Sequence, residues 1–177
     1  MGLFARKDTL PPEVRRALVL PSGDSTLGAA LLSDGAWAVA TQQMLVVVPA
    51  PQSPPAPAES SPWCRVDRAG WDPKESALTV RWVDAAEPTP LHLAHPERTT
   101  FARVFRERVQ HSVVLAETVH LPDGLSARVA VRRGPEGTLF TQVVPDPGAD
   151  VRSARSAQLI RAALDRLRST SGAPPEA

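Results

Sequence analysis

Several residue types are rare or absent in the sequence, and their scarcity indicates the kind of genome that encodes it. It contains no tyrosine and no asparagine, Ile160 is its only isoleucine, and Lys7 and Lys74 are its only lysines. Alanine, arginine, proline and valine are plentiful, whereas residue types with AT-rich codons are scarce. We infer a GC-rich bacterial genome. The abundance of arginine then reflects codon usage in part, so it is not by itself a signal for phosphate binding.

Cysteine is almost absent as well. Because Cys64 is the only cysteine, the chain forms no internal disulfide and no thiolate metal site of its own. Residues 1–9 contain no apolar stretch of signal-peptide length, and apolar stretches such as residues 44–50 fall far short of the ~20 residues of a membrane-spanning helix. We expect a soluble, cytoplasmic protein with no membrane span.

Neither sign of charge dominates, and the size is that of an ordinary domain. The net charge of +1 gives no strong attraction to nucleic acid or to an anionic membrane. A length of 177 residues with 42% hydrophobic content is enough for one domain, or for one domain with an attached subdomain.

The first half reads as short strands after an N-terminal extension, residues 1–27. A short helical piece begins at Pro11, with Val14, Leu18 and Val19 as its apolar stripe, and ends at Pro21. Strands are then predicted over residues 28–32, 36–41 and 44–48, and the last of these is apolar enough for burial on both faces.

A proline-rich segment interrupts these strands. Residues 49–62 contain six prolines and no regular apolar period, which predicts an exposed, partly extended loop. A tolerated insertion is the favoured interpretation. The alternative is a recognition segment for a proline-binding partner, although no flanking basic anchor is present.

Further strands and a helix follow the loop. Strands are predicted over residues 63–69, 77–83 and 90–94, with Leu78, Val80 and Trp82 on one face of the second of them and a turn over residues 72–75. A helix is predicted over residues 96–110, with Pro96 in its first turn. Its apolar stripe consists of Phe101, Val104, Phe105 and Val109.

The last third reads as three strands and a helix, residues 113–169, which we expect to pack on the first part because they form a small unit. The strands are predicted over residues 113–121, 125–132 and 138–144. Asp150 or Ser153 caps the helix, whose apolar stripe is Ala157, Ile160, Leu164 and Leu167. We expect the chain to fray from Ser169, with residues 170–177 as a flexible tail.

Residues 31–109 resemble the short bacterial pleckstrin-homology-like (PH-like) domains. The matching pieces are LLSDGAWAVATQQMLVVV, PWCRVDRAGWDPKESALTVRWV and PLHLAHPERTTFARVFRERV. The resemblance implies a PH-like meander or partly open barrel over residues 28–112, capped by a helix, and it implies binding without catalysis. Lipid-binding members hold phosphate with a basic first hairpin loop. Here that loop is residues 33–35, which is acidic because of Asp34 and has no basic residue. No lipid-site residues are therefore assigned.

No group of residues has the spacing of a catalytic or metal site. His92 and His95 lie three apart, which on a strand directs them to opposite faces and favours ordinary surface histidines. His111 and His120 have no obvious carboxylate partner nearby in sequence. Cys64, in an apolar context, is expected to be a small core residue. We therefore predict no catalytic, cofactor-binding or metal-binding residues.

Aromatic and basic residues leave two other kinds of site open. Trp82 lies on an apolar face and is expected in the core, whereas Trp63 and Trp71 lie among polar residues and are expected to be half exposed. Trp63 and Trp71 are therefore candidate partner-binding residues, because aromatic anchors concentrate binding energy. Six arginines could form a basic face: residues 103, 106, 108, 128, 132 and 133. We expect this face to be solvated and not to bind nucleic acid.

Together these observations predict an α+β protein of two antiparallel meanders, each followed by a packing helix. The favoured function is a non-enzymatic cytoplasmic interaction module that binds a protein or peptide partner, possibly itself, through a sheet edge or the tryptophans. One alternative is a small-ligand protein or enzyme that uses Cys64 or the histidines. A further alternative is weak nucleic-acid binding through the arginine-rich strands.

Overall fold

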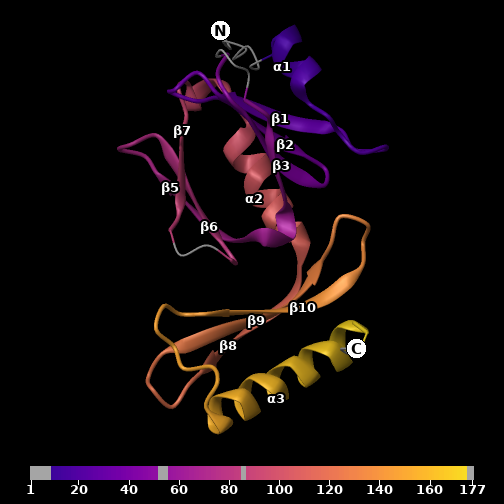
Figure 1. Ribbon diagram of the computed structural model, residues 1–177, viewed down its shortest axis with the longest axis vertical. Helices are drawn as coiled ribbons and strands as arrows, with labels where there is room; N and C mark the ends of the chain where they lie inside the picture. The colour runs from indigo at the N-terminus through magenta and orange to yellow at the C-terminus, as the bar shows by residue number, and fades with distance from the viewer. Residues whose placement is uncertain (1–8, 52–55, 85–86, 175–177) are drawn as a thin grey trace, which may run out of the picture. The chain divides into compact units, whose positions relative to one another are not determined.

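The computed structural model describes residues 9–51, 56–84 and 87–174 (Figure 1). The protein is α+β, its sheets are antiparallel, and the chain divides into two compact units, Met1–Val109 and Gln110–Ala177. The division falls inside helix α2 (Phe101–Ser112), close to the boundary expected between the two meanders.

The first unit contains two sheets whose strands pair in chain order. Its other elements are α1 (Pro12–Ala17), β1 (Thr26–Leu31), β2 (Trp37–Thr41), β3 (Met44–Val48), β4 (Glu59–Pro62), η1 (Trp63–Arg65), β5 (Val66–Asp72), β6 (Ala77–Trp82), β7 (Thr89–His92) and η2 (Pro96–Arg98). The first sheet has the order β1-β2-β3-β4, and the second has the order β5-β6-β7.

Within each sheet, strands that are neighbours in the chain pair with each other, and a short turn connects β1 to β2. Between β1 and β2, Gly35 adopts a φ of 85°, which a residue without a Cβ reaches at little cost. The Asp34 carboxylate accepts a hydrogen bond from the Ala36 N–H at 3.0 Å, and the Leu32 N–H donates to the Ala36 carbonyl at 2.8 Å. This confirms a hairpin loop at residues 33–35, between the strands predicted over residues 28–32 and 36–41.

The two sheets meet at one corner. Leu32 and Leu93 form an isolated antiparallel bridge, the Ser33 N–H donates to the His92 carbonyl, and the Ala94 N–H donates to the Leu31 carbonyl, both at 2.9 Å. The segment directly after β1 therefore pairs with the segment directly after β7, and this pairing links the two sheets.

The main core of the first unit lies between the sheets and against α2. Phe101 and Phe105 are fully buried there, Val104 is buried and Val109 is partly buried, which agrees with the predicted helix stripe. Leu78 and Val80 of β6 belong to the same cluster. Thr99 fixes the start of α2, because its hydroxyl accepts from the Phe101 N–H at 3.0 Å and donates to the Ala29 carbonyl of β1 at 2.6 Å.

The outer face of the first sheet is also covered. Val39, Val46 and Val48 form a second cluster with Val14 of α1, so β3 is buried on both faces as predicted. This arrangement explains why the strand has no polar alternation.

Several boundaries in the first unit differ from the sequence prediction. Helix α1 ends at Ala17, and Val19, expected in its apolar stripe, is 91% exposed. The predicted loop over residues 49–62 is wrong at its end, because Glu59–Pro62 pairs with β3 as β4; residues 52–55 lie outside the described residues. Pro96 begins the separate turn η2, not α2.

The second unit is a three-stranded sheet with one helix along a face (Figure 1). Its elements are β8 (Val113–His120), β9 (Ser126–Arg133), β10 (Leu139–Pro145) and α3 (Ala154–Ser171). Ala127, Val129 and Val131 from β9 belong to one buried cluster with Ile160, Leu164 and Leu167 from α3. This confirms three of the four residues predicted for the apolar stripe of α3; the fourth, Ala157, lies outside the cluster.

Helix α3 has well-defined ends. The Ser153 side chain accepts a hydrogen bond from the Ser156 N–H, which confirms one of the two predicted caps. The helix continues to Ser171 and ends at Gly172 in the left-handed conformation, so the expected fraying from Ser169 is wrong. Residues 175–177 of the predicted tail lie outside the described residues.

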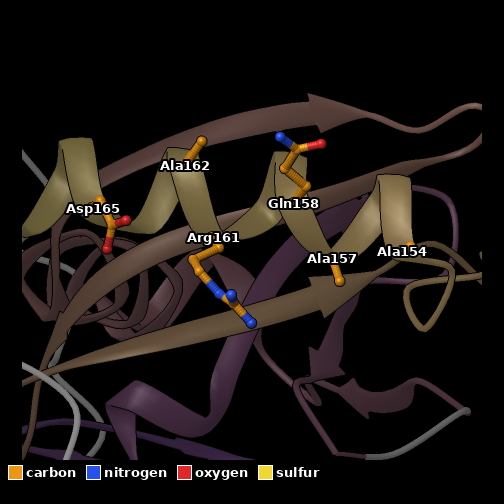
Figure 2. A pocket seen from close by; sticks show the side chains of 6 residues that line it. All are labelled: Ala154, Ala157, Gln158, Arg161, Ala162 and Asp165. Carbon is orange, nitrogen blue, oxygen red and sulfur yellow. The ribbon is translucent and has the colours of Figure 1, made fainter.

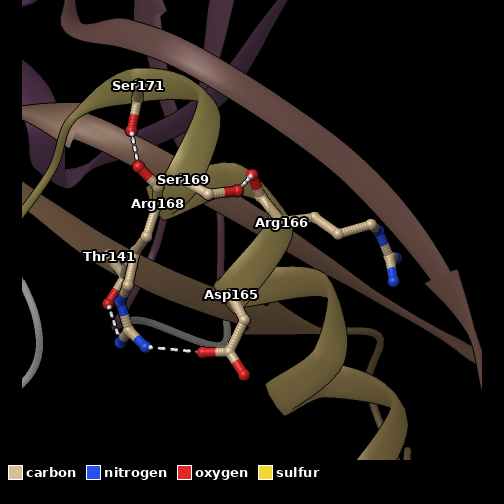
Figure 3. A network of polar contacts seen from close by, with 6 residues as sticks. All are labelled: Thr141, Asp165, Arg166, Arg168, Ser169 and Ser171. Carbon is tan, nitrogen blue, oxygen red and sulfur yellow. Dashed lines mark hydrogen bonds and ion pairs between the residues drawn. The ribbon is translucent and has the colours of Figure 1, made fainter.

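Polar side chains near the end of α3 hold it to the sheet (Figure 3). The Arg168 guanidinium donates to Thr141 Oγ1 of β10 at 3.1 Å and to Asp165 Oδ1 at 3.4 Å. Arg166 forms an ion pair with Glu117 of β8. These contacts join the helix to both edge strands of the sheet, so we assign them a structural role.

Candidate partner-binding surface

Trp63 is a core residue, which corrects the expectation that it is half exposed. It is 4% exposed, its indole Nε1 donates to the Thr41 carbonyl at 3.0 Å, and its ring meets Phe105 edge to face with the centroids 5.2 Å apart. The covering side chain comes from α2, far along the sequence, so the polar neighbours of Trp63 gave no sign of it. A buried ring cannot present itself to a partner.

A buried polar network stands beside that indole, and sequence reasoning missed it. The fully buried Thr41 donates from its hydroxyl to Asp24 Oδ2 at 2.7 Å and accepts from the Met44 N–H at 2.9 Å. It closes the turn between β2 and β3 and places the carbonyl that receives Trp63. These polar contacts lie within the fold, so we assign Thr41 a structural role.

Trp71 is exposed, as expected. It is 43% exposed on β5, and its cross-strand partner is the buried Leu78, so its ring lies on the core-facing side of the sheet. The ring nevertheless reaches solvent because β5 is the last strand of the β5-β6-β7 sheet. An aromatic ring in this position is available to a partner without any change of fold.

The outer part of β5 offers an open strand edge. We call residues 68–72 the β5 edge; all of them are exposed, and among the described residues β5 pairs with β6 alone. A methyl group added at Gly70 would meet nothing within 4 Å. The outer edge of β5 is therefore not paired with any described strand, and the face of the sheet is open at Gly70.

A second surface feature of the first unit is a groove between its sheets. Its volume is about 520 Å³, and it has an apolar floor and a polar rim. We call it the β4 groove; its lining residues are Leu45, Val47, Glu59, Ser60, Ser61, Arg65, Trp82, Asp84, Thr89 and Leu91. Trp82, expected in the core, is half-buried here, and its indole donates to Thr89 Oγ1 at 2.8 Å.

The structure does not gather the histidines and the cysteine into a reactive group. Cys64 is buried in η1 and forms no disulfide. His92 ends β7 and is exposed, His95 lies beyond that strand, and His120 Nδ1 lies 3.1 Å from Ser126 Oγ. Within residues 9–51, 56–84 and 87–174, no cluster of three or more His, Cys, Asp or Glu side chains is arranged to hold a metal ion.

The arginine-rich strand β9 is not a solvated basic face throughout. Arg132 is fully buried, Arg128 is partly buried, and on α2 the exposed Arg103 is paired with Glu107 at 2.7 Å. The expected solvated face is therefore wrong at Arg132. That residue is also out of reach of a phosphate backbone.

The exposed side of α3 carries a shallow hollow of about 420 Å³ (Figure 2). It lies where small side chains leave space along a single helix, and its lining residues are Ala154, Ala157, Gln158, Arg161, Ala162 and Asp165. With one helix as its only source of side chains, the hollow brings together no opposed chemical groups.

One carboxylate in the second unit has a shifted pKa. The pKa of Asp123 lies below its ordinary value because its side chain accepts backbone hydrogen bonds from Asp150 at 2.9 Å and from Leu125 at 3.0 Å. These bonds hold the turn after β8 next to the segment that enters α3. The shift therefore reports a structural contact.

Comparison with known proteins adds no relative. No family model, no curated protein and no solved structure matches the chain. Among the described residues, no helix combines the length and the apolar character needed to cross a bilayer.

Proposed function

We propose that the chain is a non-enzymatic, cytoplasmic interaction module whose first unit is PH-like and binds a protein or peptide partner. The strand order supports the PH-like part of this proposal: a four-stranded and a three-stranded antiparallel sheet are bridged at one corner and followed by α2. Cys64, the only cysteine, is buried and forms no disulfide within the chain, which accords with a reducing compartment.

The observation that carries the proposal is an exposed tryptophan on an open strand edge. A partner in extended conformation adds to such an edge through main-chain hydrogen bonds, and a pocket or anchor for alternate side chains supplies specificity. Tryptophan is among the residues most enriched at energetic centres of interfaces. Trp71 on the β5 edge meets both conditions.

The test is recovery of partners from a lysate of the source bacterium with the full chain as bait. Trp71→Ala is expected to lower recovery of the specific partner, because loss of a hot-spot residue costs about 2 kcal/mol or more, roughly a 30-fold change in affinity. Trp71→Phe keeps an aromatic anchor and is expected to retain part of the binding.

Phe140→Ala is the matched control, since Phe140 is an aromatic residue of similar exposure, 37%, in the second unit. It is expected to recover the same partners as the unchanged chain. If Trp71→Ala and Phe140→Ala recover them equally well, the β5 edge is not the binding surface.

The enzyme and small-ligand alternative rests on Cys64, and the structure gives it little support because the thiol is buried. Reactivity toward a thiol reagent tests it directly. Labelling of folded Cys64 faster than that of the denatured chain would favour a nucleophile and contradict the non-enzymatic proposal.

A further inference from the structure

The β4 groove has the composition of a recognition site. Leu45 and Val47 of β3, Leu91 of β7 and Trp82 of β6 form its apolar floor, and its volume of about 520 Å³ lies within the ~300–1,000 Å³ common for binding pockets. Its walls come from both sheets of the first unit, so the packing of the core fixes its shape.

One wall of the groove is a strand edge. β4 is the last strand of its sheet and, among the described residues, pairs with β3 alone. Glu59 pairs with Val47 and Ser61 pairs with Leu45, so their side chains lie on the same face of the sheet as the groove floor. A chain that adds to β4 therefore directs every second side chain over the floor.

The positive and negative charges on the rim of the β4 groove do not balance. Arg65 is neutralised by Asp84, because Nε and Nη2 both bond to Asp84 Oδ2, at 3.2 and 2.6 Å. Glu59 is exposed and has no ion pair within the described part of the chain. The rim therefore carries one uncompensated negative charge, which lies on β4 itself.

We propose that the β4 groove binds an extended peptide with an apolar residue and a basic residue two positions apart. The peptide pairs with the edge of β4, its apolar side chain enters the groove opposite Ser61, and its lysine or arginine lies opposite Glu59. The two-residue spacing follows from the alternation of side chains along a strand. A peptide fits better than a compact molecule because only another backbone uses the open edge of β4.

This surface is distinct from the β5 edge, so the inference goes beyond the proposed function and does not depend on Trp71. It names the chemistry of a second partner segment. A membrane or a nucleic acid does not fit it, because both are anionic and would meet the uncompensated Glu59.

The test uses fluorescein-labelled Ser-Thr-Leu-Thr-Lys-Thr-Ser and its variant with glutamate in place of lysine, with binding to the full chain followed by fluorescence polarisation at low salt. The lysine peptide is expected to bind about fivefold more tightly, the size of a favourable cross-strand charge pair. Glu59→Lys is expected to invert this preference, and Glu59→Gln to abolish it. A third peptide with serine in place of leucine is expected to bind more weakly than either.

Glu75→Lys makes the same charge change on the exposed turn after β5, outside the groove, and is expected to keep the preference for lysine. Trp71→Ala is also expected to keep it, which separates this result from failure of the proposed function. The inference is overturned if neither peptide binds, if Glu59→Lys keeps the original preference, or if Glu75→Lys inverts it as well. Circular dichroism of each variant shows whether it is folded.

Discussion

The two units bury their apolar residues in different ways. In the first, aromatic residues of α2 and η1 meet between two sheets, and the four-stranded sheet is covered on its outer face as well. In the second, one helix covers one sheet with aliphatic side chains, and Phe140, the only aromatic residue of that unit, is exposed.

This difference determines which unit can be recognised from sequence. The strands of the second unit are neighbours along the chain, and α3 follows them directly, so alternation and helical periodicity carry most of the information. The first unit depends on contacts between distant residues, such as Thr99 with Ala29 and Trp63 with Phe105. Four variants test this contrast, from the largest expected effect to the smallest.

The aromatic centre of the first unit is the most sensitive position. Phe105→Ala is expected to lower the free energy of unfolding by about 3–5 kcal/mol, because it leaves a cavity in a fully buried cluster and removes the partner of the Trp63 ring. Urea unfolding followed by tryptophan fluorescence measures this, since all four tryptophans, residues 37, 63, 71 and 82, lie in the first unit. Phe140→Ala, made at an exposed site of the second unit, is expected to change stability by less than about 0.5 kcal/mol; circular dichroism measures it, because that unit contains no tryptophan. Similar losses in both variants would refute the contrast.

Removal of the hydrogen bonds that Thr99 makes between α2 and β1 is expected to have the next largest effect. Thr99→Val keeps the shape of the side chain but removes the cap of the Phe101 N–H and the donor to the Ala29 carbonyl. We expect a loss of about 1–2 kcal/mol, measured by the same fluorescence assay. Thr26→Val, at an exposed site on β1, is the control and is expected to be near neutral. Equal stability of the two variants would show that the long-range bond contributes nothing.

The cap of α3 tests the local character of the second unit. Ser153→Ala removes the acceptor of the Ser156 N–H and is expected to cost about 1 kcal/mol. Thermal unfolding followed by circular dichroism at the helix band measures the change. Ser169→Ala, in the last turn and exposed, serves as the control, and a drop in its midpoint as large as that of Ser153→Ala would count against the cap.

The pH dependence of the second unit gives the smallest effect. The pKa of Asp123 is lowered in the folded chain by the backbone bonds from Asp150 and Leu125, so its contribution to stability is present above the ordinary pKa of about 3.9 and is lost as the pH falls through the lower folded value. Asp123→Asn is therefore expected to unfold at a lower temperature than the unchanged chain near neutral pH. The gap should narrow as the pH falls from about 5 toward 2. Parallel midpoints over that range would exclude the contribution.

Much of the fold was accessible from sequence because its apolar patterns are regular. The alternation of Ala127, Val129 and Val131 and the helical spacing of Ile160 and Leu164 were enough to identify β9 and α3 and the faces they bury. Turn residues worked for the same reason: glycine and aspartate fix the local backbone at residues 33–35 and do not depend on distant contacts.

The missed features share a different cause. The strand β4 reads Glu-Ser-Ser-Pro, which has no apolar alternation, because it lies at an edge and pairs through its backbone. Trp63 is surrounded in sequence by polar residues and proline but is covered by Phe105 of a distant helix. The β4 groove was not predicted because its lining residues come from strands scattered between positions 45 and 91. Of the two candidate tryptophans, only Trp71 is accessible to a partner.

The corner where β1 meets β7 has a consequence for the speed of folding. Its bonds join residues about sixty positions apart, such as Ser33 and His92, so most of the first unit must be looped before they form. Loop closure of this kind opposes folding entropically and slows it, whereas hairpins close in microseconds. During refolding we therefore expect the helical signal of α3 to be recovered before the fluorescence of buried Trp63, which depends on closure of the first unit.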